Sequence, residues 1–165
     1  MEGKKSKPRA LLVFGAPCSG KTTFSERFSR RFGLSYFDLD ELRVQHRLTR
    51  KNILLIVELL AQTKKDLMFE GGIGTEKERT EIRNILRAAG YEPTLIWIQT
   101  DLSAIKLRLK MRYRSPSMAR EAYDKAVVGL EAPTDVEKPL ILSGKHTFET
   151  QARHVIAGLA TTEQK

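Results

Sequence analysis

Residues 15–22 read Gly-Ala-Pro-Cys-Ser-Gly-Lys-Thr, and this spacing is typical of a phosphate-binding loop, or P-loop. Its glycines let the backbone curl so that successive N–H groups point at phosphate oxygens. Lys21 is then expected to reach the outer phosphates, and the Thr22 hydroxyl to bind Mg²⁺. The residues predicted to surround the phosphates are Gly15, Ala16, Pro17, Cys18, Ser19, Gly20, Lys21, Thr22 and Thr23.

The segments on either side of the loop support the same interpretation. Residues 10–14 are a short apolar run of the kind that forms a buried strand. Phe24, Phe28 and Phe32 recur every four residues, which predicts the buried stripe of a helix, and Gly33 follows where a helix-ending glycine belongs. A strand, the loop and a helix therefore come in the order that a P-loop requires. The alternative is a glycine-rich turn with a surface lysine.

The rest of the chain alternates short apolar runs with segments of helical periodicity. Further strands are predicted at residues 34–37, 67–69, 94–99 and 140–142. Helices are predicted to start near Asp40, Asn52, Thr75, Asp101, Ser115 and Phe148. The helix over residues 52–64 is apolar almost all round, which predicts burial on every side. This alternation indicates an α/β fold with a mainly parallel sheet, whose ligands bind beyond the carboxyl ends of the strands.

Three acidic residues follow predicted strands at that same edge. Asp40 could accept the proton of an attacking hydroxyl group, or it could simply cap the helix that starts there. Asp38 is expected in the outer shell of a metal ion. Glu70 could orient Mg²⁺, or it could be a loop acid before the glycine turn at residues 71–72. The predicted metal-binding set is therefore Thr22, Asp38 and Glu70.

A basic run lies between the fourth and fifth predicted strands: Lys106, Arg108, Lys110, Arg112 and Arg114. Arg108 and Arg112 are neighbours on one helix face because they are four residues apart. A Ser-Pro pair and a second helix follow, which favours a lid that closes over phosphates and excludes water. We expect Arg108, Arg112 and Arg114 to bind the nucleotide. The alternative is a solvated helix.

Length and charge limit the function classes without selecting one. The chain has 165 residues, enough for one domain with a real core. Its 29 Lys and Arg against 20 Asp and Glu give a net charge of +9, which favours an anionic partner or a solvated basic surface. The longest apolar run, residues 53–61, is too short to span a bilayer. No signal-type cleavage site follows the basic start, so a cytoplasmic location is expected.

The single cysteine and the three histidines show no spacing typical of a disulfide framework or a metal site. Cys18 is the single cysteine, so an internal disulfide framework is excluded. Its place near a predicted helix N-terminus could make it open to oxidation, although its small size suffices to explain it. His46, His146 and His154 have no metal-ligand spacing.

The chain resembles the small P-loop kinases of the AAA-domain group, related to polynucleotide kinases, zeta toxins and chloramphenicol phosphotransferases. The resemblance runs from about residue 9 to residue 159. It is carried by the loop at residues 15–23, by Asp40-Glu41-Leu42-Arg43, by Arg108-Leu-Lys-Met-Arg112 and by Leu130-Glu131-Ala132-Pro133. The group usually has Asp where this chain has Glu70. The Gly-Gly pair at residues 71–72 is also similar to shikimate and gluconate kinases, whose Arg-Pro-Leu lid motif is absent here.

This resemblance implies a three-layer P-loop fold with a five-stranded parallel sheet in the order 2-3-1-4-5, a helical lid, ATP and Mg²⁺. It also implies that Asp40 is the base, and that Arg43, Gly71 and Gly72 hold the acceptor. Lys21, Asp40 and Arg112 are the expected catalytic residues. ATP rather than GTP follows from the resemblance, since no guanine-reading Asn-Lys-x-Asp motif is present.

The sequence thus predicts one kinase domain over residues 9–160, with a lid at about 108–128, a basic start at 1–8 and a tail at 161–165. The expected function is transfer of the γ-phosphate of ATP to a hydroxyl of a small metabolite, a nucleoside or a polynucleotide 5′ end. One alternative is a P-loop NTPase switch without an acceptor, and another is a shikimate- or gluconate-type kinase. A third, a nucleic-acid-binding protein, lacks the exposed aromatic stripe of a stacking platform. No obligate protein partner and no membrane contact are expected.

Overall fold

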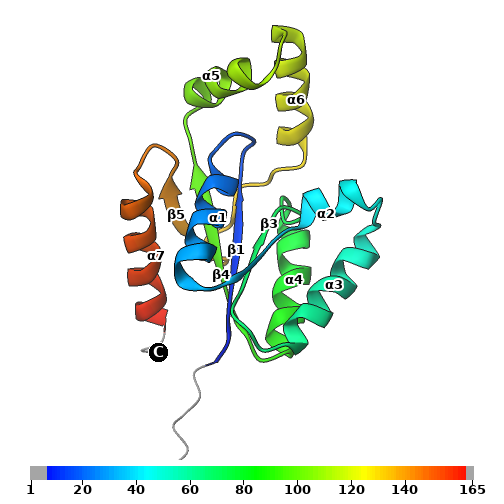
Figure 1. Cartoon of the computed structure of the whole chain (residues 1–165), viewed down its shortest axis with the longest axis vertical. Helices are drawn as coiled ribbons and strands as arrows, with labels where there is room; N and C mark the ends of the chain where they lie inside the picture. The colour runs from blue at the N-terminus through cyan, green and yellow to red at the C-terminus, as the bar shows by residue number, and fades with distance from the viewer. Residues whose placement is uncertain (1–6, 163–165) are drawn as a thin grey trace, which may run out of the picture.

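The computed structural model describes residues 7–162 and contains one parallel sheet with helices on both faces (Figure 1). The basic start at residues 1–8 and the tail at 161–165 lie mostly outside the described residues. The strands are β1 (Arg9–Gly15), β2 (Ser35–Asp38), β3 (Leu67–Glu70), β4 (Glu92–Gln99) and β5 (Leu140–Ser143). The helices are α1 (Lys21–Phe32), α2 (Leu39–Gln45), α3 (Arg50–Gln62), α4 (Glu76–Ala88), α5 (Leu102–Arg112), α6 (Pro116–Val128) and α7 (Phe148–Thr162).

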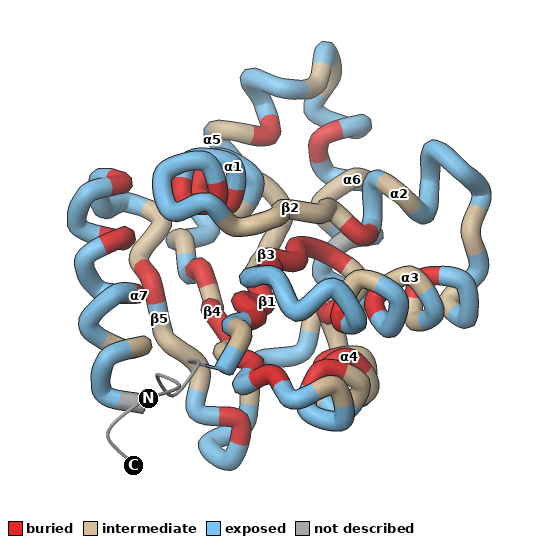
Figure 2. The backbone as a smooth tube through the Cα atoms, turned by 60° about the horizontal axis from the view of Figure 1, so that its bottom comes forward, coloured by how far each residue is buried: buried red, intermediate tan, exposed pale blue. Residues whose placement is uncertain are grey.

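The strand order is β2-β3-β1-β4-β5, and every pairing is parallel, so the predicted fold class and topology are confirmed. Strand β1 lies at the centre and alternates its side chains between two cores. Leu11 and Val13 face α1 and α7, whereas Leu12 and Phe14 face α3 and α4. Figure 2 shows the buried residues along the central strands and the inner sides of these helices. This three-layer arrangement brings all five carboxyl ends to one edge.

Helices α5 and α6 stand beyond that edge as a hairpin, which we call the lid (Figure 1). The lid has a small core of its own, formed by Ile105, Leu109 and Ala119, and Ala16 and Cys18 of the P-loop pack against it. The lid is thus attached to the rest of the molecule directly above the P-loop.

Local signals in the sequence explain where several helices begin and end. The capping box of α4 forms as predicted, with Thr75 accepting from the Glu78 N–H and Glu78 accepting from the Thr75 N–H. Gly33 ends α1 in the left-handed region at φ 72°, where glycine is favoured. Phe32, predicted to be buried, is 41% exposed because it lies in the last turn of α1.

The prediction that the helix over residues 52–64 is buried on every side is wrong. In α3, Ile53 and Val57 are buried, but Leu55 and Leu59 are 51% and 53% exposed. Helix α3 belongs to the outer layer and turns one side inward, where it packs against α4 and α2 and contributes to the core on that face of the sheet (Figure 1). An apolar composition therefore overstated its burial.

Candidate active site

The P-loop connects β1 to α1 and has the closed shape that its sequence predicts. The Ser19 N–H donates to the Ala16 carbonyl at 3.2 Å, and the Lys21 ammonium donates to the same oxygen at 3.2 Å. Gly15 has φ 154°, and a Cβ there would lie 2.4 Å from the Ile98 carbonyl oxygen, so only glycine fits. The chain thus forms an anion cradle at the N-terminus of α1.

A cavity of about 760 Å³ opens in front of this loop, and we call it the nucleotide cavity. Its walls come from the P-loop, α1, the ends of β2 and β3, the lid and the start of α7. Among the predicted nucleotide and metal residues it is lined by Pro17, Cys18, Ser19, Gly20, Lys21, Thr22, Thr23, Asp38, Glu70, Arg108 and Arg112. Gly15 lies behind the loop, in a second cavity described below.

Glu70 is held by two hydroxyl groups at the end of β3. Thr22 donates to its Oε1 at 2.6 Å, and Tyr36 donates to its Oε2 at 2.9 Å. Glu70 is only 3% exposed, and this burial raises the pKa of its carboxyl group, although the hydrogen bond from Thr22 and the nearby charge of Lys21 oppose the rise. Glu70 is therefore a buried, hydrogen-bonded residue of β3 rather than an exposed loop acid.

The two aspartates after β2 have separate positions. Asp38 caps α2, because its Oδ1 accepts from the Glu41 N–H at 2.9 Å. Asp40 makes no cap, so the alternative of a capping role for Asp40 is wrong. Its carboxylate is half-exposed and packs against Gly71, where a Cβ would lie 2.6 Å from Oδ2. Gly71 also has φ 74°, so the close approach and the backbone conformation both need glycine.

A second cavity of about 510 Å³ lies on the other side of Asp40, and we call it the acceptor cavity. Arg43 and Gly72, which the sequence predicts to bind the acceptor, are among the residues that line it, and the Arg43 guanidinium lies 3.9 Å from Asp40. Gly129 and Leu130, which follow the lid, close its far wall. Pro17, Lys21, Asp40 and Gly71 line both cavities, so the two cavities meet at these four residues.

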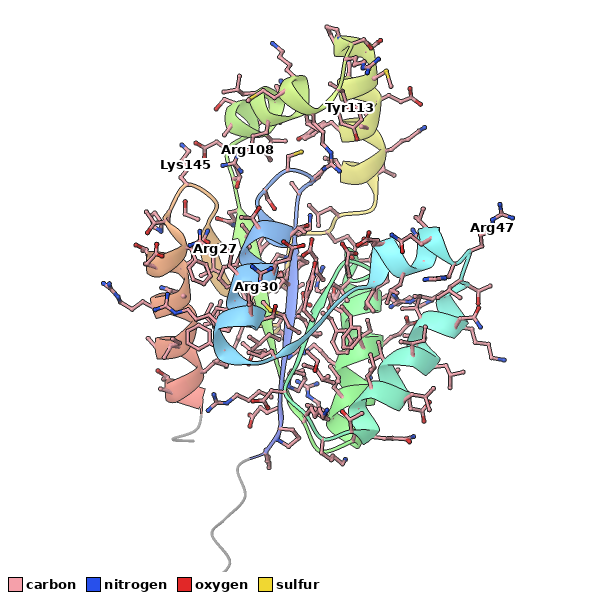
Figure 3. All side chains as sticks on the ribbon, viewed as in Figure 1. Arg27, Arg30, Arg47, Arg108, Tyr113 and Lys145 are labelled. Atoms are coloured by element: carbon pink, nitrogen blue, oxygen red, sulfur yellow. The ribbon has the colours of Figure 1, made fainter. Side chains whose placement is uncertain are left out.

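The three lid arginines are placed differently. Arg108 donates to the carbonyls of Cys18 at 2.9 Å and Gly144 at 3.1 Å, and thus joins the P-loop to the loop before α7 (Figure 3). Arg112 lines the nucleotide cavity. Arg114 is exposed and lines neither cavity, which agrees better with the solvated alternative.

The sequence interpretation missed Arg50, which supports the acceptor cavity. It donates from Nη1 to the Gly72 carbonyl at 2.5 Å and from Nη2 to Glu81 at 3.0 Å. A further hydrogen bond reaches the Glu78 carbonyl at 3.2 Å. These contacts hold the glycine turn in place from the start of α3. No local pattern marks this arginine, since its partners lie 22 to 31 residues away.

Arg79 and Glu137 form a buried pair that was also missed. Arg79 is fully buried and binds Glu137 through two hydrogen bonds of 2.7 and 2.9 Å. It also donates to the carbonyls of Gly74 at 2.8 Å and Glu131 at 3.1 Å, and lies over the Phe14 ring at 4.6 Å. This arginine therefore fastens the segment after the lid to the wall of the acceptor cavity.

The donors around Thr22 fit Mg²⁺ in kind, because hydroxyl and carboxylate oxygens are the ligands that this ion prefers. Glu70 and Asp38 lie on paired positions of neighbouring strands, so their carboxylates share one edge. Within residues 7–162, no three His, Cys, Asp or Glu side chains cluster closely enough to hold a metal by themselves. Proteins generally hold Mg²⁺ through one or two carboxylates together with phosphates and water.

Among the described residues, 7–162, no helix is long and apolar enough to cross a membrane.

The central P-loop, the 2-3-1-4-5 sheet and the lid give this chain the fold that solved P-loop kinases have. The chain belongs to the AAA domain family, which matches residues 11–129. No curated protein sequence matches it significantly.

Several solved kinases share the fold. A sugar kinase from Janibacter sp. HTCC2649 is 18% identical with a TM-score of 0.73, over 93% of this chain and 95% of that one. A gluconokinase from Sinorhizobium meliloti 1021 is 17% identical with a TM-score of 0.72, over 96% and 95%. The APS kinase of Mycobacterium tuberculosis in complex with AMPPNP and APS is 18% identical with a TM-score of 0.67, over 93% and 98%.

Proposed function

We propose that the chain is an ATP- and Mg²⁺-dependent kinase that transfers the γ-phosphate to a hydroxyl group of a small metabolite, a nucleoside or a polynucleotide 5′ end. The observation that carries the proposal is the junction of the two cavities at Lys21 and Asp40. A phosphate on one side and a hydroxyl on the other would meet there, beside a cation and a carboxylate. A nucleotide switch without an acceptor would not need the second cavity.

In this reaction the acceptor oxygen bonds to the γ-phosphorus, the bond to the β–γ bridging oxygen breaks, and ADP leaves. Asp40 accepts the proton of the acceptor hydroxyl as the new bond forms. Lys21 and Arg112 stabilise the charge on the transferring group, and Arg43 holds the acceptor. Positioning and electrostatics of this kind are most of what phosphoryl transfer requires of a protein.

Thr22, Glu70 and Asp38 are the residues that would hold Mg²⁺. When bound, this ion neutralises charge on the phosphate oxygens. Thr22 could bind the ion through its hydroxyl oxygen while it donates its proton to Glu70 Oε1 in the 2.6 Å hydrogen bond between the two side chains.

The nucleotides bound in solved structures of similar fold support ATP as the phosphate donor. The APS kinase was solved with AMPPNP, and a Kti12 protein from Chaetomium thermophilum, 15% identical with a TM-score of 0.68, was solved with ADP-AlF3.

We also propose the domain organisation that the sequence predicts: one kinase domain over residues 9–160 whose lid, about 108–128, closes over the nucleotide. A cytoplasmic location remains part of this proposal. We also propose that the chain is related to polynucleotide kinases, zeta toxins and chloramphenicol phosphotransferases.

The experiment is an acceptor screen with γ-labelled ATP and Mg²⁺. The panel contains nucleosides, 5′-hydroxyl oligonucleotides, sugars, amino sugars, sugar acids and shikimate-like acids. The proposal predicts that label moves from ATP to a hydroxyl of one class. Label released only as free phosphate, with every acceptor unmodified, would favour the NTPase switch instead.

A further inference from the structure

Tyr36 reaches the predicted metal site although it lies two residues before Asp38 on β2. Its position on the strand is paired with Met68, and Asp38 is paired with Glu70. Two residues of strand span roughly 6.6 Å, a distance that the long phenol side chain can cover by leaning along the strand. Its hydroxyl thereby donates to Glu70 Oε2 at 2.9 Å.

Both oxygens of Glu70 are consequently fixed by protein hydroxyls. Thr22 holds Oε1 at 2.6 Å, and Tyr36 holds Oε2. A glutamate has one more rotatable bond than an aspartate, so a carboxylate at this position needs more restraint to keep one orientation. Each carboxylate oxygen has two lone-pair sites, so each retains one after accepting a hydroxyl proton. These remaining sites are available for a metal ion or its water ligands.

We propose that Tyr36 is a positioning residue for the Mg²⁺ site. Its hydroxyl keeps the Glu70 carboxylate turned toward Thr22, so that nucleotide-bound Mg²⁺ finds a preformed partner. The inference rests on the proposed function. Tyr36 lines neither the nucleotide cavity nor the acceptor cavity, so it acts on the site only through Glu70.

Tyr36→Phe isolates this role, because it removes the hydroxyl and keeps the ring that packs beside α1. Partners that orient metal ligands typically contribute about 10- to 100-fold to metal affinity. We therefore expect the enhancement of ADP binding by Mg²⁺ to fall about tenfold in the variant. ADP binding measured with EDTA should be unchanged, since Tyr36 is not among the residues that line the nucleotide cavity.

The assay is calorimetric titration of ADP into wild type and variants, once with EDTA and once with saturating Mg²⁺. Tyr91→Phe is the matched control, because its hydroxyl also donates a hydrogen bond, to the Lys65 carbonyl at 2.8 Å, and Tyr91 lines neither cavity. It should lose no Mg²⁺ enhancement. The same substitution is also tested in a Glu70→Gln variant. There Tyr36→Phe should cause no further loss of the Mg²⁺ enhancement, because the partner of the Tyr36 hydroxyl is already changed.

The outcomes separate the two proposals. Wild-type enhancement in Tyr36→Phe, or the same loss in Tyr91→Phe, would overturn the role of Tyr36 while leaving the kinase proposal intact. An additional loss in the Glu70→Gln background would also overturn it, because Tyr36 would then act by another route. A wild-type protein that binds ADP no better with Mg²⁺ than without would overturn both.

Discussion

Replacing Arg79 by Met should be among the most destabilising single changes in the chain. Arg79 is fully buried, its partner Glu137 is 6% exposed, and two backbone carbonyls also depend on its guanidinium. Removing one member of a buried ion pair leaves an uncompensated charge, which costs about 3–5 kcal/mol of unfolding free energy. For a domain of this size, about 2–4 °C of melting temperature per kcal/mol gives a decrease on the order of 10 °C.

Urea and thermal unfolding at pH 7 measure this effect. The control is Arg120→Met, whose ion pair with Asp124 spans 3.7 Å between side chains that are 85% and 63% exposed. Such surface pairs contribute about 0–1 kcal/mol, so the control should remain close to wild type. Equal stability of Arg79→Met and wild type would refute the inference that this pair anchors the segment after the lid.

The stability contributed by the Arg79–Glu137 pair should depend on pH. Hydrogen bonds from Arg79 lower the pKa of Glu137 in the folded protein, so the unfolded chain binds its proton at higher pH. The stabilisation is therefore complete above the ordinary glutamate pKa of about 4.3 and is lost as the pH falls through the lower folded value. The stability gap between wild type and Glu137→Gln should shrink on acidification below about pH 4.

Three further changes test the two cavities. Lys21→Ala should abolish Mg²⁺-dependent ATP binding in calorimetry while the circular dichroism spectrum stays native, and unchanged affinity would contradict the P-loop assignment. Gly71→Ala should reduce phosphoryl transfer strongly in the coupled kinase assay, because a Cβ would lie 2.6 Å from the Asp40 carboxylate at a φ of 74°; normal turnover would mean that Asp40 is free to move. Arg112→Ala should lower turnover about a hundredfold or more, as for a lost transition-state cation, whereas Arg114→Ala should change it little; equal effects would contradict the different placement of the two side chains.

Local patterns in the sequence were enough to predict the P-loop, the strands and an α/β fold with a mainly parallel sheet. The P-loop spacing, the apolar runs of the strands and the Thr75–Glu78 capping box each depend on residues a few positions apart, and each formed as expected. The strand order came from resemblance to P-loop kinases rather than from periodicity, and it too is confirmed.

The parts that could not be predicted depend on residues far apart in the chain. Arg79 and Glu137 are 58 positions apart, and Tyr36 and Glu70 are 34 apart, so no periodic signal connects them. The exposure of Leu55 could not be read from its own helix, because it depends on whether another layer covers α3. Backbone geometry also decided between the two aspartates, since only Asp38 has the extended conformation of an N-cap, at φ −88°.

The roles predicted for individual site residues remain proposals, although the structure brings most of them together around the two cavities. Arg108 shows why proximity is not enough. It lines the nucleotide cavity, yet its guanidinium binds two carbonyl groups of the protein. Its predicted contact with phosphates stays a prediction, and it would require these hydrogen bonds to rearrange.

The central claim is that Asp40 takes the proton of an acceptor hydroxyl at the junction of the two cavities. The most direct measurement compares Asp40→Asn with wild type, using the acceptor found in the screen and following both ATP affinity and the rate of transfer. The substitution preserves the size of the side chain and removes its basic oxygen. We predict near-normal ATP affinity with transfer slowed by about two to four orders of magnitude, the usual contribution of a general base. Full transfer by Asp40→Asn would contradict the account and shift the role of base to Asp38 or Glu70.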